Sequence, residues 1–267
     1  MNNDVSTEDR LYFLRLFSDF DESSDNGEII KFTFETHDSE NCKALNKKYD
    51  LKKIMGAGDS ITQISNLKKW VSGNLFFRGE QIMQNEFDNT DCLELVDRIK
   101  ESGHAMNCRY IALFFTQILL SAGFKARLVS CVPMELDYYN CHWVTEVYIN
   151  ELNKWIIADA AYNLFYFNKN GEPLNLLELR KMIIASEKIR FVSSDSIYHS
   201  GVMDCWIAFC FRFKFILNNK YNMLSDGNKF FMCLNPSNFK ISDKKISGDK
   251  SRPHGLKFYY DSKLFWG

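Results

Sequence analysis

The sequence has few of the residues that break regular structure, and it has no excess of charge of one sign. Its 267 residues include only 4 Pro and 13 Gly, so long flexible linkers are not expected. Lys and Arg total 33 and Asp and Glu total 34, which gives a formal net charge of -1 at pH 7. A nucleic-acid binder usually shows a basic excess or a basic stripe. We therefore expect no nucleic-acid partner.

Long apolar runs are also missing. The N-terminal MNNDVSTEDR carries acidic residues where a secretory signal needs positive charge. The most apolar later stretch, Cys205 to Leu217, is interrupted by Arg212 and Lys214 and is too short to span a bilayer. We therefore expect a cytoplasmic protein with no membrane partner.

The eight cysteines include no CxxC pair, which argues against a zinc ribbon. Cys141 and His142 are adjacent, but neighbours on a strand face opposite sides of the sheet and would not share a metal. We therefore expect no metal and no cofactor. In a reducing compartment most of these thiols are small buried hydrophobic residues.

What the sequence does have is apolar and aromatic material for a packed core. Hydrophobic residues make up 46% and aromatic residues 15% of the chain, which argues against disorder over most of its length. We expect a core over residues 49–186. An N-terminal extension (1–48) would pack on it, and a β-rich C-terminal extension (187–267) would belong to the same domain.

Periodicity predicts the elements of this core. Residues 107–120 are apolar on nearly every side, which indicates a buried central helix that ends at Gly123. Further helices are expected over 50–71 (interrupted at Gly56–Gly58), 91–99 and 174–186. Strands are expected over 30–34, 126–132, 142–149, 154–158, 211–217, 229–234 and 256–260, with a hairpin turn at 150–153.

Three residues in this order suggest nucleophilic chemistry. Cys108 lies in the first turn of the predicted central helix, where free N–H groups and the helix dipole favour a thiolate. His142 begins a strand and Asp159 ends the next one, so a hairpin would bring the imidazole and the carboxylate together. Each residue alone is more often structural. Together they give the order of a nucleophile, its base and the group that orients the base.

The blocks GHAMNCRYIALFFTQILLSAGFKARLVS, HWVTEVY and KWIIADAAYN resemble the transglutaminase-like superfamily of papain-fold cysteine enzymes. The resemblance runs from about Leu51 to Met182 and implies an α+β fold with a central helix on an antiparallel sheet, plus additional C-terminal strands. The superfamily's Cys, His and Asp correspond to Cys108, His142 and Asp159. The final Phe265–Trp266 pair is similar to the ending of some bacterial members with an extra β-rich part.

Two positions depart from the superfamily's pattern. Arg109 follows the cysteine where many members have Trp or a small residue, and Ala160 stands where many have Pro. Neither change removes a triad side chain, so they bear on specificity more than on chemistry.

The resemblance implies acyl transfer through a thioester on a peptide, a protein or another amide-containing substrate. Since the sequence has no calcium-loop motif such as DxDxDG, we favour a hydrolase, either a peptidase or an amidase. The alternatives are a non-catalytic peptide- or glycan-binding module that uses the same cleft, and a structural papain-like domain. Residues expected to border the cleft are Tyr139, Asn140, Trp143 and Tyr162. Candidates for a second oxyanion donor are Trp70, Gln81 and Asn107. Substrate and oligomeric state stay open.

Overall fold

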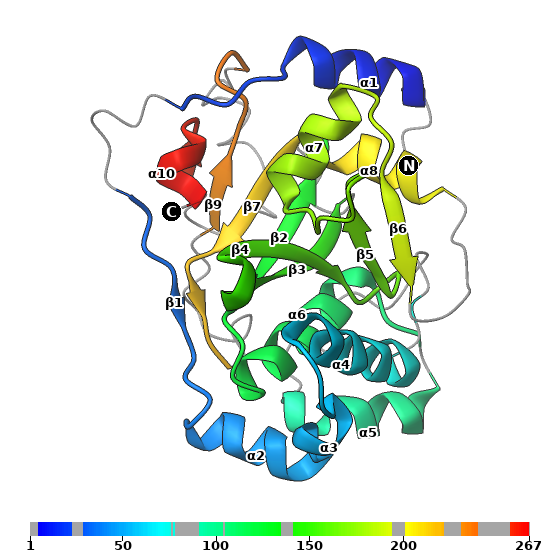
Figure 1. Cartoon of the computed structure of the whole chain (residues 1–267), viewed down its shortest axis with the longest axis vertical. Coiled ribbons are helices and arrows are strands. Elements are labelled where there is room, and N and C mark those ends of the chain that lie inside the picture. The colour runs from blue at the N-terminus through cyan, green and yellow to red at the C-terminus, as the bar shows by residue number, and fades with distance from the viewer. Residues whose placement is uncertain are drawn as a thin grey trace.

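The structure of the chain is a computed structural model, shown in Figure 1. It describes residues 5–22, 29–75, 77, 91–103, 105–134, 141–193, 201–221, 231–239 and 257–266. All structural statements below concern these residues.

Most of the helices precede the main sheet in the chain. The helices are α1 (Thr7–Leu16), α2 (Glu40–Tyr49), α3 (Leu51–Met55), α4 (Ser60–Asn74), α5 (Cys92–Ser102), α6 (Cys108–Ser121), the 3-10 turn η1 (Asn150–Leu152), α7 (Leu176–Ile184), α8 (Val202–Phe209) and α10 (Ser262–Trp266). The strands are β1 (Thr33–Phe34), β2 (Ala126–Val132), β3 (His142–Ile149), β4 (Lys154–Asp159), β5 (Leu164–Phe167), β6 (Arg190–Ser193), β7 (Arg212–Ile216), β8 (Asn218–Asn219), β9 (Phe231–Leu234) and β10 (Lys257–Tyr259).

One eight-stranded sheet organises the molecule, in the order β10-β9-β7-β2-β3-β4-β5-β6. Every neighbouring pair is antiparallel except β10 and β9. The separate two-stranded pair of β1 and β8 is parallel. Because β7 pairs with β2, strands from the C-terminal part of the chain extend the sheet formed by β2 to β5.

Helices lie on both sides of the sheet (Figure 1). Below it, α2 to α6 form a core with one set of strand side chains, such as Val147 and Ile156. Above it, α1, α7 and α8 cover the other set, which includes Val129, Val144 and Ile157. The alternation of strand side chains thus divides the interior into two apolar layers.

The central helix α6 is defined at both ends by local hydrogen bonds. The Asn107 side chain accepts a hydrogen bond from the Tyr110 N–H at 3.1 Å, which caps the N-terminus. At the other end Gly123 has φ +93°. The N–H groups of Gly123 and Phe124 donate hydrogen bonds to the carbonyls of Leu120 and Leu119, respectively. These caps place Cys108 at the first helical position.

The α+β class, with a central helix packed on an antiparallel sheet and further C-terminal strands, is confirmed. The predicted central helix, the two helices before it, the β3–β4 hairpin and the three C-terminal strands match the observed elements within a few residues. The strand predicted over 30–34 is wrong in extent. Only Thr33–Phe34 is extended and paired, because β8 offers just two residues to pair with.

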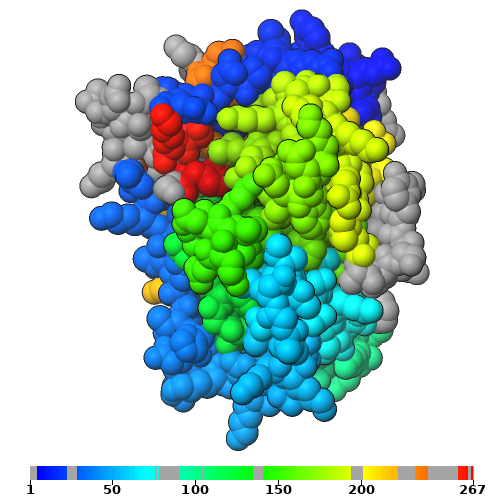
Figure 2. Space-filling view, viewed as in Figure 1, coloured from blue at the N-terminus to red at the C-terminus, as the bar shows by residue number. Residues whose placement is uncertain are grey.

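The terminal parts pack against the central part of the chain. Arg180 on α7 donates hydrogen bonds to the carbonyls of Phe17 and Ser18, which follow α1. Trp266 in α10 packs its ring on Phe213 and Phe215 of β7. In the space-filling view α1 lies along one end of the molecule and α4 covers the opposite half beside the β3–β4 hairpin (Figure 2). The predicted boundaries at residues 48 and 186 stay predictions.

Candidate active site

Cys108 occupies the N-terminus of α6 with its thiol partly exposed. Its backbone N–H lies in the first helical turn, where no carbonyl of the same helix is in position to accept it. The thiol sulfur lies 3.7 Å from the carbonyl oxygen of Cys141. The helix N-terminus therefore offers an electropositive setting for an anion at this sulfur.

His142 and Asp159 meet at the end of the β3–β4 hairpin. The ladder runs from Ile149↔Lys154 to Thr145↔Ala158, so Asp159 stands one step further along, diagonal to His142 on the same face. Nε2 of His142 lies 2.8 Å from Oδ2 of Asp159. The two residues are 2% and 0% exposed, so little water competes with this contact.

The thiol is on the other side of the imidazole. Cys108 lies close enough to the His142 imidazole to contribute to the rise in its pKa. Because Nε2 is engaged by Asp159, Nδ1 is the ring nitrogen left for the thiol. The imidazole thus bridges sulfur and carboxylate.

Both oxygens of the Asp159 carboxylate are held by donors. Oδ1 accepts from the backbone N–H groups of Ala161 and Tyr162, each at 3.1 Å. Oδ2 accepts a hydrogen bond from the Tyr166 hydroxyl at 2.9 Å, and the same oxygen contacts Nε2 of His142. This saturation fixes the carboxylate in one orientation.

His142 and Asp159 shift each other's pKa values. Burial acts to lower the pKa of His142, but the Asp159 carboxylate outweighs it, with further contributions from Cys205 and Cys108, and the pKa is raised well above its usual value. Burial acts to raise the pKa of Asp159, yet His142 and the donors of Tyr162 and Tyr166 hold it below its usual value. The Asp159 carboxylate therefore stabilises the imidazolium form of His142.

Aromatic rings enclose the imidazole. The Tyr162 ring lies 5.1 Å from the His142 ring, tilted by 37°, and the Trp206 ring from α8 meets it edge-on at 5.6 Å. Tyr162 also packs against Phe77 at 5.2 Å, and its hydroxyl is hydrogen-bonded to the Cys205 thiol. The His142 ring thus has little freedom to turn.

Helix α4 holds the turn that follows Asp159. The buried Lys68 donates to Oδ1 of Asn163 at 2.8 Å, and Asn163 has φ +54°. Ser72 donates to the carbonyl of Ala160 at 2.7 Å. These contacts stabilise a left-handed turn conformation that a non-glycine residue adopts at a cost.

The structure brings Cys108, His142 and Asp159 together. Tyr162 lies against the imidazole and is partly exposed. Trp143 is 6% exposed, and its indole N–H donates to the Cys141 sulfur at 3.1 Å. Tyr139 and Asn140 lie outside the described residues. Binding of substrate by these four residues stays a prediction.

The three candidates for a second oxyanion donor lie in different settings. The Asn107 side-chain oxygen caps α6, and Trp70 packs with the rings of Tyr49 and Phe114. Gln81 lies outside the described residues. The Cys108 N–H is therefore the donor that the geometry places beside the thiol.

Sequence reasoning missed three residues of the site, namely Lys68, Tyr166 and Trp206. For Tyr166 a signal existed, because the apolar run Leu164–Phe167 directly follows the Asp159 turn, as a further hairpin strand would. Trp206 comes from a helix that periodicity did not indicate.

Neither a metal cluster nor a membrane-spanning helix is found in the described part of the chain. No group of three or more His, Cys, Asp or Glu side chains there could hold a metal ion. No helix there is long and apolar enough to cross a bilayer.

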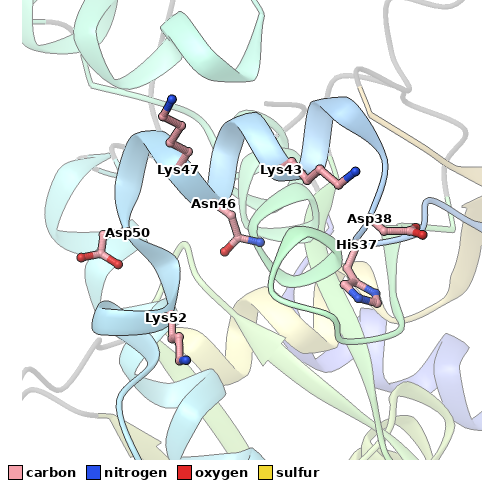
Figure 3. A pocket seen from close by; sticks show the side chains of 7 residues that line it. All are labelled: His37, Asp38, Lys43, Asn46, Lys47, Asp50 and Lys52. Atoms are coloured by element: carbon pink, nitrogen blue, oxygen red, sulfur yellow. The ribbon is translucent and has the colours of Figure 1, made fainter.

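A pocket of about 560 Å³ lies apart from the triad residues, along α2 and the start of α3 (Figure 3). It is lined by His37, Asp38, Lys43, Asn46, Lys47, Asp50 and Lys52. All of these except Asn46 are exposed, so water solvates their charges. None of the three candidate triad residues lines this pocket.

Residues 48–160 match the family model of the transglutaminase-like superfamily. The match spans α3 to α6 and β2 to β4, and it includes Cys108, His142 and Asp159. We call residues 48–160 the transglutaminase-like segment. This transglutaminase-like segment starts near the expected Leu51 but ends at Ala160 rather than at Met182. Its family supports a cysteine-dependent kind of enzyme.

Other comparisons add little. No curated protein matches the chain. A solved structure, that of a putative cysteine protease from Cytophaga hutchinsonii, is 17% identical over 60% of this chain, with a TM-score of 0.34. The match spans 55% of the length of that protein.

Proposed function

We propose that the protein is a cysteine-dependent acyl-transfer enzyme that hydrolyses an amide bond. Cys108 is the nucleophile, His142 the general acid and base, and Asp159 the group that orients the imidazole. The observation that carries the proposal is the buried 2.8 Å contact between His142 Nε2 and Asp159 Oδ2, with Cys108 at the N-terminus of α6 beside the same ring. The substrate is a peptide, a protein or another amide-containing molecule, and we place the enzyme in the cytoplasm.

In the acylation step the proton of the Cys108 thiol has passed to His142, and the thiolate of this ion pair attacks the carbonyl carbon of the amide. A carbon–sulfur bond forms, and the carbonyl oxygen becomes an oxyanion beside the Cys108 N–H. As the carbon–nitrogen bond breaks, the imidazolium gives its proton to the leaving amine. Asp159 stabilises the imidazolium during this exchange.

In the deacylation step water replaces the amine. His142 takes a proton from the water, and the hydroxide attacks the thioester carbon. The carbon–sulfur bond breaks, the carboxylic acid leaves, and the thiol regains its proton. An amine in place of water would give transamidation by the same route, and we favour water because the sequence has no calcium-loop motif such as DxDxDG.

Labelling with iodoacetamide across pH tests the activated nucleophile. Five of the other cysteines are buried, whereas Cys141 and Cys205 are partly exposed like Cys108. We expect Cys108 to react faster at neutral pH than either of these two, as read by peptide mass spectrometry. His142→Ala should abolish the difference, and Cys108→Ser should remove the label at this site.

Cys141→Ser and Cys205→Ser are the matched controls, because both change a partly exposed thiol close to that of Cys108. Neither should slow labelling of Cys108 as His142→Ala does. Equal reactivity of Cys108, Cys141 and Cys205 at neutral pH would rule out the proposed nucleophile. Turnover of a fluorogenic amide panel, with and without added primary amine, then separates hydrolysis from transamidation.

A further inference from the structure

Tyr166 touches the candidate triad, yet the chemistry proposed above does not use it. Its hydroxyl donates to Asp159 Oδ2 at 2.9 Å, the same oxygen that faces His142. Tyr166 lies on β5, beyond the end of the transglutaminase-like segment. Its side chain is buried, so this hydroxyl has been taken out of water to meet the carboxylate.

We propose that Tyr166 is a positioning residue that keeps the Asp159 carboxylate ionised and aimed at His142, with Trp206 of α8 holding both rings in place. The inference rests on the proposed function, because it assigns a role within the same site.

The carboxylate needs a donor at this position. Burial favours the protonated form of a carboxyl group unless donors and a cation compensate. Two backbone N–H groups serve Oδ1, whereas only Tyr166 and His142 serve Oδ2 among the hydrogen bonds described. A protonated Asp159 would no longer attract an imidazolium.

Tyr166 itself is suited to donate. Burial and the neighbouring Asp159 carboxylate raise its pKa well above the usual value. The phenol therefore stays protonated throughout the pH range in which Asp159 and His142 titrate. It can offer its proton to Oδ2 without losing it.

Trp206 connects the two side chains. Its ring lies 5.3 Å from that of Tyr166, at 86° to it, and 5.6 Å from that of His142, at 89°. Trp206 is fully buried, so it excludes water from the region around the His142–Asp159 contact. A dry setting strengthens charged hydrogen bonds and makes each donor matter more.

Tyr166→Phe, which removes one oxygen atom, is the test variant. The ring resonances of His142, followed by NMR, should show an acidic inflection where Asp159 takes up its proton. Loss of a hydrogen bond to a charged group corresponds to about a tenfold or larger rise in the affinity of Asp159 for that proton. The inflection should therefore move to higher pH, and labelling of Cys108 should slow in the same acidic range while changing little at neutral pH.

Phe191→Leu is the matched control. Phe191 packs on Tyr166 at 5.7 Å from the neighbouring strand β6, so the change loosens the same ring but leaves its hydroxyl. We expect lower stability in urea but an unmoved inflection. Circular dichroism verifies that both variants are folded.

An acidic inflection at the wild-type pH in Tyr166→Phe would overturn the positioning role. An equal displacement in Phe191→Leu would overturn it too, because packing would then explain the effect. If wild-type Cys108 is no more reactive than Cys141 and Cys205, the proposed function fails separately. The inflection of His142 still decides the role of Tyr166 in that case.

Discussion

Arg127 and Glu146 form an ion pair inside the protein, and removing one partner should cost more than removing both. They are cross-strand neighbours on β2 and β3, with Nη2 and Oε2 2.9 Å apart. Both are fully buried. The other carboxylate oxygen accepts the Leu176 N–H at the start of α7, at 3.0 Å. The guanidinium also lies 4.1 Å from the centre of the Trp155 ring.

The magnitudes follow from these contacts. Glu146→Gln keeps an oxygen for the Leu176 N–H but leaves the guanidinium without its counter-charge, which costs about 3–5 kcal/mol. Arg127→Met strands the carboxylate at a similar cost of about 3–5 kcal/mol. The double variant Arg127→Met/Glu146→Gln buries no charge, and its main penalty is an unsatisfied amide, about 1–3 kcal/mol.

Urea unfolding followed by circular dichroism measures all four proteins. The two single losses would sum to about 6–10 kcal/mol, so we expect a coupling free energy of about 3 kcal/mol or more in favour of the pair. A double variant that loses as much as the two single variants together would refute the reasoning.

The pH dependence gives an independent check. Burial already raises the pKa of Glu146 despite Arg127, and Arg127→Met should raise it further. A carboxyl group with a raised pKa in the folded state contributes stability that is lost as pH rises from its unfolded value through its folded value. Arg127→Met should therefore be more stable, relative to wild type, near pH 5 than near pH 8. The opposite trend would contradict the assignment.

Three more predictions concern the site and its support. In Asp159→Asn the largest raising influence on His142 is gone and burial remains, so its pKa should fall below the usual value in an NMR titration; an unchanged pKa would contradict the electrostatic account. Lys68→Met leaves the Asn163 side chain without its buried donor, so we expect a loss of about 1–3 kcal/mol in urea unfolding and slower labelling of Cys108. The exposed Lys69→Met should stay within about 0.5 kcal/mol of wild type. A fragment of residues 48–160 should show no cooperative unfolding transition, because Val129, Val144 and Ile157 lose the cover of α7 and α8; a folded monomeric fragment would be the contrary result.

The elements that sequence predicts best are those with a strong local signal. The helix α6 has an Asn cap, an apolar surface and a glycine stop, so its start at Cys108 follows from the sequence alone. The β3–β4 hairpin consists of two consecutive apolar strands joined by a short turn. In contrast, α8 has Gly201 as its N-cap residue and no side-chain cap, and β5 has only four residues after a tight turn. Local patterns are weak there, and tertiary packing determines the structure.

The residues of the candidate site also fall into those that the sequence predicts and those that it does not. Cys108, His142 and Asp159 could be placed from the sequence because a helix start and a hairpin fix their positions relative to the backbone. The donor Tyr166 and the packing residue Trp206 could not be placed in this way. Both are aromatic residues in apolar stretches, and such a pattern predicts only that they are buried in the core. Their role depends on which partner the fold sets against them.

The transglutaminase-like segment therefore contains the three candidate triad residues but not the whole of their surroundings. Asp159 is the last residue of β4 and lies one residue before the end of that segment. The chain beyond it forms β5 and α8, whose residues Tyr166 and Trp206 pack against the carboxylate and the imidazole. Water excluded by Trp206 strengthens the His142–Asp159 contact, and that contact in turn holds the ring that binds the thiol. The reactivity that we propose for Cys108 thus depends on residues that come about 60 to 100 positions later in the chain, and the residues next to the cysteine give no sign of this packing.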